Sequence, residues 1–149
     1  MTDLSQLQPV KWKGVVSHQT PFDLFNYHDF VMDLRPAIVV EVGRGDGGTL
    51  EFLRDLGIAL EVLSVDLDEP VPDVCDAMVF LDGDVYSADA MTQDLGVYVP
   101  RARQIVVCHT NRPDWGARPA LDAWEWSEGW MEWTPKFPTQ HSFFCRVVT

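Results

Sequence analysis

The sequence predicts an open α/β fold, built on a doubly wound and mostly parallel sheet that ends in an antiparallel hairpin. Three observations predict it. Short, β-branched apolar segments alternate with segments of helical period, as in sheets that helices cover on both faces. Each early strand candidate stops at a glycine or an aspartate, and two aromatic segments close the chain. We expect a single domain over residues 1–149, because no linker or repeat divides them.

The first regular element is predicted to be a helix that ends at Leu34. Residues 1–19 are polar and irregular, apart from a short strand or turn around residues 12–16. Thr20 is a candidate N-cap with proline at the first helical position, and a proline after Arg35 stops the helix. Residues at helical spacing form the face expected to be buried: Leu24, Tyr27, His28, Val31 and Leu34.

The later elements continue the alternation of strands and helices. Four strands are predicted from apolar runs: 37–42, 60–65, 77–81 and 104–108. Three helices are predicted from caps and stops: 49–56 before Gly57, one that begins after Ser87, and 117–128 before Gly129. The aromatic segments 130–137 and 141–148 should pair as the closing hairpin. Four tryptophans are expected to cover the last helix and strand, or else to line a pocket or a subunit interface: Trp124, Trp126, Trp130 and Trp133.

The strongest local signal is the glycine-rich segment after the first predicted sheet strand. Gly43, Gly45 and Gly48 fit the GxGxxG of dinucleotide-binding folds, whereas Glu41 and the glycines at 43, 45 and 47 fit the acidic loop of class I methyltransferases. Glycines let backbone N–H groups approach a ligand closely. Glu41 favours the second pattern, because its carboxylate would attract the cationic end of S-adenosylmethionine and repel a pyrophosphate. A turn without any ligand remains the alternative.

Polar residues also follow the other predicted strands. Asp66 stands about 18 residues after the glycine loop, where nucleotide folds place an acid on the ribose hydroxyls. Asp82 and Asp84 could hold a divalent metal, orient a substrate hydroxyl or cap a helix. His109 is the best general-base candidate, because a neutral imidazole can take a proton from a hydroxyl near pH 7. Each of these residues also has a purely structural alternative.

Charge and composition exclude several classes of function. Eleven basic and 23 acidic residues give a net charge of −12, which repels nucleic acid and anionic membranes. Neither a membrane-spanning run nor a signal-peptide pattern is found. Cys75, Cys108 and Cys145 lack CxxC spacing and are expected to be reduced. We therefore expect a cytoplasmic protein whose partner is a small-molecule substrate rather than nucleic acid or membrane.

In the order of its segments the chain resembles the cephalosporin hydroxylase and rhamnosyl O-methyltransferase family, a branch of the class I methyltransferases. The resemblance covers most of the sequence, in the glycine loop and these segments: 12–14, 19–24, 34–36, 81–84, 98–100, 106–111, 116–124 and 143–144. It implies a Rossmann-like fold and S-adenosylmethionine as cofactor. The implied cofactor residues are Glu41, Gly43, Gly45, Gly47, Asp66 and Asp82. It also implies O-methylation of a hydroxyl.

Two departures from the family pattern stand out. The resemblance implies a magnesium ion held by a DxDH motif and a Glu-Asp pair, but Val85 replaces the motif's histidine, and Cys108 and His109 occupy the positions of the pair. Magnesium prefers oxygen ligands, so we expect the metal site to be lost or altered, and its ligands stay unknown. Only ten residues separate Asp66 from Ala77, too few for the helix-strand-helix that usually covers the adenine.

Those observations lead to a ranked set of functional hypotheses. The first is an S-adenosylmethionine-dependent O-methyltransferase acting on a small hydroxylated molecule, with His109, or Asp82 with Asp84, receiving or polarising the hydroxyl proton. The alternative is a catalytically degenerate member that serves as a binding or assembly module, and a nicotinamide-dependent oxidoreductase is a third. The deletion should leave the strand before Asp66 at the sheet edge, which predicts a homo-oligomer.

Overall fold

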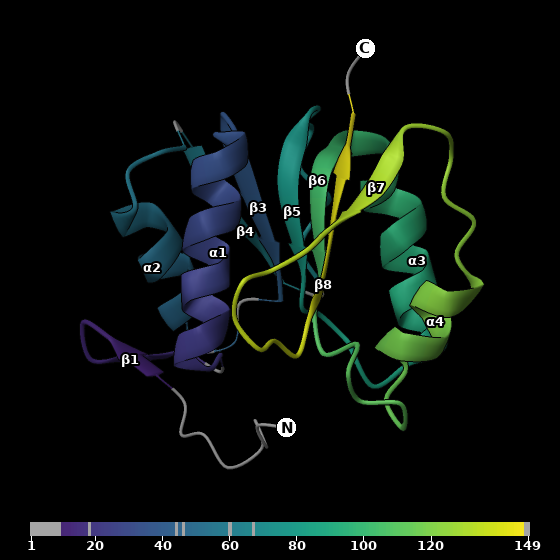
Figure 1. The fold of residues 1–149 in the computed structure, drawn as a ribbon, viewed down its shortest axis with the longest axis horizontal. Helices are drawn as coiled ribbons and strands as arrows, with labels where there is room; N and C mark the ends of the chain where they lie inside the picture. Colours follow the sequence, from purple (N-terminus) through teal and green to yellow (C-terminus); the bar gives the residue numbers. More distant parts are fainter. Residues whose placement is uncertain are drawn as a thin grey trace.

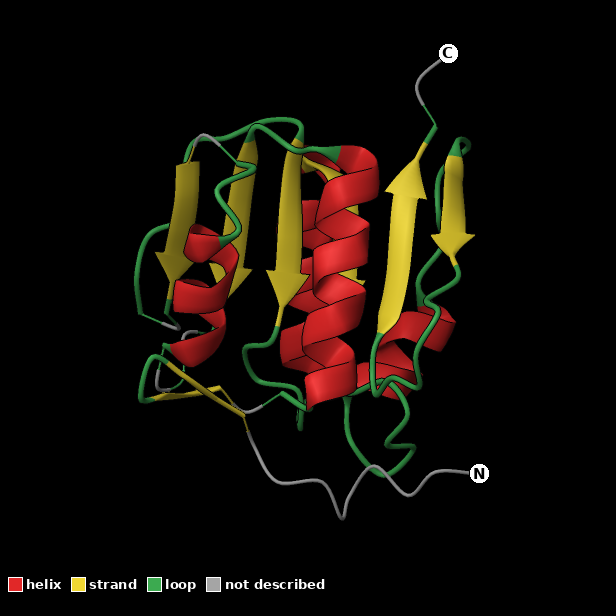
Figure 2. Ribbon diagram, turned by 60° about the vertical axis from the view of Figure 1, so that its left-hand side comes forward, coloured by secondary structure: helices red, strands yellow, loops and turns green. Residues whose placement is uncertain are grey.

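A six-stranded sheet lies at the centre of the molecule, with helices on both of its faces (Figures 1 and 2). The structure is a computed structural model and describes residues 10–17, 19–43, 45, 47–59, 61–66 and 68–147. The strand order is β4-β3-β5-β6-β8-β7. The first four are parallel, β8 runs antiparallel to β6, and β7 antiparallel to β8. The predicted doubly wound sheet with a closing hairpin is therefore confirmed.

The elements follow the predicted order. The sheet strands are β3 (Ile38–Val42), β4 (Glu61–Val65), β5 (Ala77–Leu81), β6 (Ala102–Val107), β7 (Trp130–Trp133) and β8 (Ser142–Arg146). The helices are α1 (Pro21–Leu34), α2 (Gly48–Asp55), α3 (Ala88–Tyr98) and α4 (Ala117–Ala123), with a 3-10 turn η2 (Val99–Arg101). A separate antiparallel hairpin precedes them, β1 (Val10–Trp12) and β2 (Val15–Ser17). None of the described helices is both long and apolar enough to span a bilayer.

Helix α1 begins and ends where its sequence predicts. The Thr20 hydroxyl accepts the backbone N–H of Asp23 at 3.2 Å, and the Asp23 carboxylate accepts the N–H of Thr20 at 3.1 Å, which is a reciprocal capping box. Arg35 closes the helix in the left-handed conformation. The placement of His28 on the buried face is wrong, because its side chain is 48% exposed. Phe30 lies in the core instead, since each helical position turns by about 100°.

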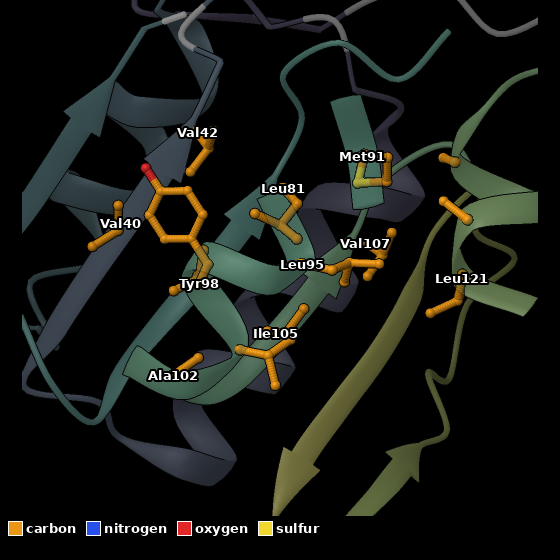
Figure 3. Close-up of a cluster of buried hydrophobic side chains, with 14 of the residues drawn as sticks. Val40, Val42, Leu81, Met91, Leu95, Tyr98, Ala102, Ile105, Val107 and Leu121 are labelled. Carbon is orange, nitrogen blue, oxygen red and sulfur yellow. The ribbon is translucent and has the colours of Figure 1, made fainter. Parts of the chain in front are cut away.

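Two buried clusters attach the helices to opposite faces of the sheet. Figure 3 shows the cluster under α3 and α4, which contains Val40, Val42, Leu81, Met91, Leu95, Tyr98, Ala102, Ile105, Val107 and Leu121. The cluster under α1 and α2 contains Leu24, Tyr27, Phe30, Val39, Phe52, Met78, Phe80, Val106 and Phe143. Neighbouring residues of β3 and β5 alternate between the two clusters, so both faces of these strands are buried from water, as their continuous apolar sequence predicts.

Helix α4 is shorter than its pattern predicts, since it ends at Ala123 instead of residue 128. Trp124 leaves the helix in an extended conformation. Two residues later the ring of Trp126 stacks on Phe144 with 4.5 Å between ring centroids, and it lies 5.1 Å from Trp130. Aromatic packing on the hairpin therefore outweighs the helical pattern. Trp124, Trp126 and Trp130 pack on the cluster under α3 and α4, as expected, whereas Trp133 packs on the other face of the sheet, against Phe30 and Phe143.

The two edges of the sheet are β4 and β7. The edge position of β4 agrees with the prediction, and residues 68–76, which follow it, contain neither helix nor strand. The shortened connection therefore adds nothing outside β4 in the described part of the chain. Strand β7 ends at Trp133, four residues before its predicted end. Pro135 follows shortly and has no N–H with which to extend the ladder.

Candidate functional site

Most of the predicted site residues lie just beyond the carboxyl ends of neighbouring parallel strands. Gly43, Asp82 and Cys108 come directly after β3, β5 and β6. The hydrogen-bond ladder continues one residue further, because the Asp82 N–H donates to the Val42 carbonyl at 2.9 Å and the Cys108 N–H to the Leu81 carbonyl at 3.0 Å. These parallel strands therefore place the three loop starts side by side, where α/β sheets bind their ligands.

The glycines of the loop after β3 have different surroundings: one lies against another loop, and another faces open space. Gly43 has φ +88°, and a Cβ atom there would overlap the carbonyl oxygen of Asp82 and lie 2.5 Å from its carbonyl carbon. This glycine therefore lets the loops after β3 and β5 touch. Gly45 and Gly47 also have positive φ, and a Cβ at Gly47 would meet no atom within 4 Å. Glu41 is buried within β3, just before the loop.

Asp66 and Asp84 stand in surroundings that differ from those of Asp82. Asp66 is exposed at the end of β4, next to the glycine loop in sheet order. Asp84 is half-buried, and its charge adds to burial in raising the pKa of Asp94 on helix α3. The structure therefore separates Asp84 from Asp82 in its surroundings, although the two stand in one loop.

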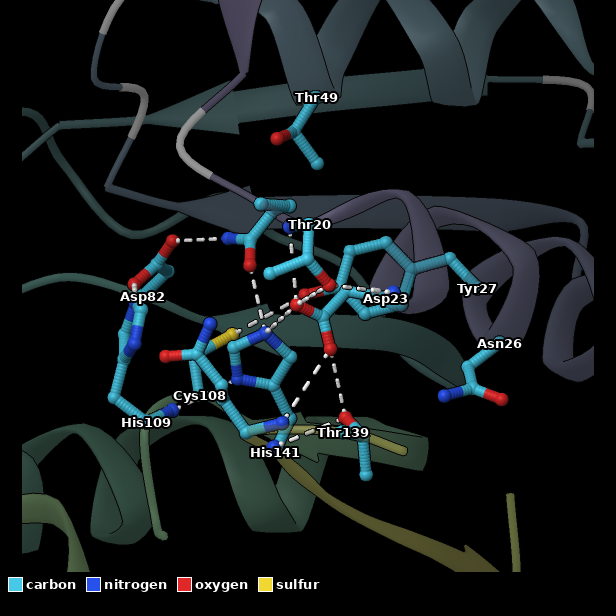
Figure 4. Close-up of polar contacts among 12 residues, drawn as sticks. Thr20, Asp23, Asn26, Tyr27, Thr49, Asp82, Cys108, His109, Thr139 and His141 are labelled. Atoms are coloured by element: carbon cyan, nitrogen blue, oxygen red, sulfur yellow. Dashed lines mark hydrogen bonds and ion pairs between the residues drawn. The ribbon is translucent and has the colours of Figure 1, made fainter. Parts of the chain in front are cut away.

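Asp82 and His109 form the centre of the candidate site (Figure 4). The His109 Nε2 atom lies 3.1 Å from the Asp82 Oδ1 atom, and the two side chains are 13% and 22% exposed. The second ring nitrogen, Nδ1, is buried and has no hydrogen-bond partner among the described residues. The ring lies against Trp115, with 5.3 Å between centroids. One nitrogen on a carboxylate and one without a described partner is the arrangement of a histidine that a carboxylate orients.

The backbone of His109 is in an uncommon conformation. Its φ of +59° lies in the left-handed region, which costs a side-chain-bearing residue free energy unless its neighbours hold it there. The His109 N–H donates to Nδ1 of His141 at 2.8 Å, and the two rings meet edge to face at 5.0 Å. His141 therefore helps to hold His109, two residues after the end of β6.

Gln19 and His141 are functional candidates that the sequence patterns do not single out. The Gln19 amide nitrogen donates to Asp82 Oδ2 at 2.9 Å, and its Oε1 lies 2.6 Å from His141 Nε2. His141 Nε2 also lies 3.5 Å from Asp23 Oδ2, and both of these side chains are fully buried. The available signal is the resemblance, which includes Gln19 in segment 19–24. His141 is more than a hundred residues away, so only folding brings it there.

Asp23 is a buried carboxylate that stays ionised. Burial alone would raise its pKa, but the charge that His141 carries when protonated, together with hydrogen bonds from His141, Thr20 and Thr139, outweighs burial and holds the pKa well below the ordinary range. The Thr139 hydroxyl donates to Asp23 Oδ1 at 2.9 Å, and the Gln140 N–H donates to the same oxygen at 3.4 Å. The cap of helix α1 is thereby joined to the loop that carries His141.

The residues present do not fit the magnesium ion that the family resemblance implies. Burial, with the nearby charge of Asp82, raises the pKa of the Cys108 thiol well above its usual range, so the sulfur stays protonated. Its neighbour His109 is turned onto Asp82, and Val85 is buried in the core. No group of three or more His, Cys, Asp or Glu side chains in the described residues could hold a metal ion. The Asp82–His109 contact stands where oxygen ligands would be needed.

A doubly wound sheet, with a glycine loop after β3 and acidic residues at the neighbouring strand ends, places the chain among the α/β proteins that bind nucleotide-containing cofactors. The family model for rhamnosyl O-methyltransferase/CmcI matches residues 5–108. The chain therefore belongs to the rhamnosyl O-methyltransferase/CmcI family, and the expected family resemblance is confirmed.

Individual relatives agree with this membership. A 60-residue stretch is 32% identical to a rhamnosyl O-methyltransferase of Mycobacterium leprae (strain TN); it covers 38% of this chain and 26% of that protein, so the match spans about a quarter of the relative. A solved CmcI structure with SAH has a TM-score of 0.65 at 17% identity and covers 99% of this chain and 88% of its own. A CmcI structure with Mg and SAM has a TM-score of 0.64 at 19% identity, with 99% and 82% covered. These two likenesses show a common fold.

Proposed function

We propose that this protein is an S-adenosylmethionine-dependent methyltransferase that methylates the hydroxyl group of a small molecule. The observation that carries the proposal is the Asp82–His109 pair, whose buried Nδ1 atom has no described partner and stands at the edge of the sheet that also ends in the glycine loop. Membership of the rhamnosyl O-methyltransferase/CmcI family supports this reaction, as do family structures solved with SAH and with SAM.

The ends of β3 and β4 supply the proposed cofactor residues. Glu41 would attract the cationic methionine end, and exposed Asp66 would accept hydrogen bonds from the ribose hydroxyls. Gly45 and Gly47 would let the cofactor approach the backbone at the start of α2, where a Cβ at Gly47 meets no neighbouring atom. Gly43 contributes differently: because it has no side chain, its loop can lie directly against the backbone of Asp82. The bound cofactor supplies an electrophilic methyl group on a sulfonium.

In the proposed reaction the His109 Nδ1 atom takes the proton of the substrate hydroxyl. The methyl carbon gains a bond to that oxygen as it loses its bond to sulfur, and the sulfonium becomes a neutral thioether. Asp82 stabilises the imidazolium that forms, because its carboxylate already contacts Nε2. Asp84, further along the same loop, is proposed to orient the substrate. Alignment of donor and acceptor supplies most of the remaining acceleration.

Thermal unfolding with S-adenosylmethionine, S-adenosylhomocysteine or NAD tests the cofactor assignment. A ligand at 100 times its Kd stabilises the folded state by about 2.7 kcal/mol, which raises the melting temperature by several degrees. We expect this shift with the two adenosyl compounds and not with NAD. A shift with NAD alone would indicate an oxidoreductase, and no shift with any of them would contradict the proposal in favour of a binding module.

The variant His109→Asn tests the proposed base. We expect it to keep the thermal shift with S-adenosylhomocysteine and to lose methyl transfer by about 100-fold or more, because general-base catalysis contributes about 10²–10⁴-fold. Unchanged turnover in a panel of small hydroxylated acceptors would remove His109 from the mechanism.

We also propose a homo-oligomer joined along the outer edge of β4. Within the described strands β4 pairs on one side only, and Val62 and Leu63 are half-exposed there. Such an edge can accept hydrogen bonds from a second copy. Light scattering at micromolar concentration should give a mass above that of one 16.9 kDa chain, and a monomeric mass would contradict it.

The three cysteines form no disulfide, which supports a reducing compartment such as the cytoplasm.

A further inference from the structure

A continuous path of polar contacts leads from His141 to His109 through Gln19 and Asp82 (Figure 4). Which atom donates and which accepts at each contact can be derived from one group that can only donate. The backbone N–H of His109 can only donate, and it donates to His141 Nδ1 at 2.8 Å. The Nδ1 atom of His141 is therefore an acceptor without a proton, and the single proton of this neutral ring is on Nε2.

The next contacts follow from that proton. His141 Nε2 donates to Gln19 Oε1 at 2.6 Å and faces Asp23 Oδ2 at 3.5 Å. With its oxygen accepting, the Gln19 side chain must present its NH₂ group to Asp82 Oδ2, at 2.9 Å. The carboxylate of Asp82 can only accept, so its Oδ1 atom takes a hydrogen bond from Nε2–H of His109. A neutral His109 then carries no proton on Nδ1.

We infer that Gln19 and His141 are positioning residues that hold the Asp82 carboxylate against His109 Nε2, and thereby keep His109 in the tautomer whose Nδ1 lone pair is free to accept a proton. Reversing the Gln19 amide would place two oxygens in contact at Asp82 and two N–H groups in contact at His141. Water cannot relieve such a mismatch at His141, since that side chain and Asp23 are fully buried. The two residues thus orient the carboxylate that sets the proton position of His109.

His141 acts on His109 at two points. It holds the left-handed backbone through the hydrogen bond to His109 N–H, and it sets the ring tautomer through Gln19 and Asp82. This inference rests on the proposed function only in its catalytic consequence. The tautomer itself is a property of the unliganded protein and can be measured without turnover.

Nitrogen NMR of protein labelled with ¹⁵N in its histidine rings tests the inference directly. The two tautomers of a neutral imidazole have distinct ¹⁵N shifts, and His109→Asn and His141→Asn assign the signals. In the unchanged protein above pH 7 we expect both rings to carry their proton on Nε2. A His109 ring protonated on Nδ1, or an even mixture of tautomers, would overturn the inference without any variant.

The variant Gln19→Leu removes the link between the two histidines. The Asp82 carboxylate then loses its partner at Oδ2, and we expect it to turn away from His109 in part of the molecules, so that His109 becomes a mixture of tautomers. His141 should keep its proton on Nε2, because Asp23 and the His109 N–H still face that ring. Gln104→Leu is the matched control, since it removes a buried glutamine from β6 outside this path. An unchanged His109 tautomer in folded Gln19→Leu would show that Gln19 does not set it.

Turnover separates this inference from the proposed function. In a protein that methylates an acceptor, Gln19→Leu should lower kcat by at least about two-fold, because an even mixture leaves half of His109 with Nδ1 free and a displaced Asp82 stabilises the imidazolium less. The KM for S-adenosylmethionine should change little. Unchanged kcat with an altered tautomer would refute the catalytic consequence. If no acceptor is methylated although both tautomers are as expected, the proposed function fails and the positioning stands.

Discussion

The substitution Gly43→Ala probes the contact between the loops after β3 and β5. In the native conformation its new Cβ would overlap the Asp82 carbonyl oxygen and lie 2.8 Å from the Cα atom of Gly83. The obstructing atoms are backbone, so no side-chain rotation relieves the overlap. The loop that carries Asp82 must move away from β3, and the Asp82–His109 contact moves with it.

The expected cost has two parts. A residue with a side chain in the left-handed region costs about 1–2 kcal/mol more than glycine, and forcing an atom into packed surroundings typically costs about 1–3 kcal/mol. Gly43→Ala should therefore lower the free energy of unfolding by about 2–5 kcal/mol. Gly47→Ala is the matched control, because Gly47 has the same φ of +88° with no atom within 4 Å of its Cβ position. It should lose only the first part, about 1–2 kcal/mol.

Urea unfolding followed by fluorescence measures both losses, with thermal melting as a second reading. A chain of 149 residues changes its melting temperature by about 2–4 °C for each kcal/mol. We expect Gly43→Ala to melt about 10 °C below the unchanged protein and clearly below Gly47→Ala. Equal losses in the two variants would refute the assignment of Gly43 to a close backbone contact.

Three further outcomes are expected. Asp23→Asn should lose more stability near pH 7 than near pH 2: the pKa of Asp23 is lowered on folding from its ordinary value of 3.8, so its carboxylate stabilises the fold fully above about pH 4, and this contribution shrinks as the pH falls toward the lowered pKa. Denaturant unfolding over that range checks it, and parallel profiles for the two proteins would contradict it. Ser87→Ala should cost about 1 kcal/mol, because the Ser87 hydroxyl accepts the Ala90 N–H at 3.1 Å and caps helix α3; a loss below about 0.3 kcal/mol would count against the cap. Chelation with EDTA should leave the thermal shift with S-adenosylhomocysteine unchanged, because protonated Cys108 and the Asp82-bound His109 make a poor magnesium site; a shift that returns only with added Mg²⁺ would be evidence for a metal.

The departures from the family pattern form a coherent set in the structure. Cys108 replaces an acidic residue at the end of β6 and lies against the Tyr27 hydroxyl, 3.7 Å away in the core. Val85 replaces a histidine and packs under α3 and α4. Both positions have thus become apolar or neutral, while His109 contacts Asp82 directly. The proposed chemistry therefore relies on an imidazole where the family resemblance implies a metal.

Local patterns in the chain were sufficient to predict the order of strands and helices. The Thr20 capping box, the run before Gly43 and the Ser87 cap act within a few residues, so their effect is readable without the fold. The position of Asp82 and His109 is also predictable, because residues that follow parallel strands lie at the carboxyl ends of the strands, where α/β sheets bind ligands. The predictions failed where distant packing decided the outcome, as when Trp126 left the expected helix to stack on Phe144.

The polar path to His109 is the part that local patterns could not supply. Gln19 precedes the first helix and His141 precedes the last strand, and neither has a neighbour in sequence that marks it as functional. Their contacts exist because α1 packs on the face of the sheet that includes β8, where Phe30 meets Phe143. Periodicity and caps specify elements one at a time, whereas a hydrogen bond across 122 positions depends on how all of them pack. Tertiary structure therefore decided which nitrogen of His109 is left free.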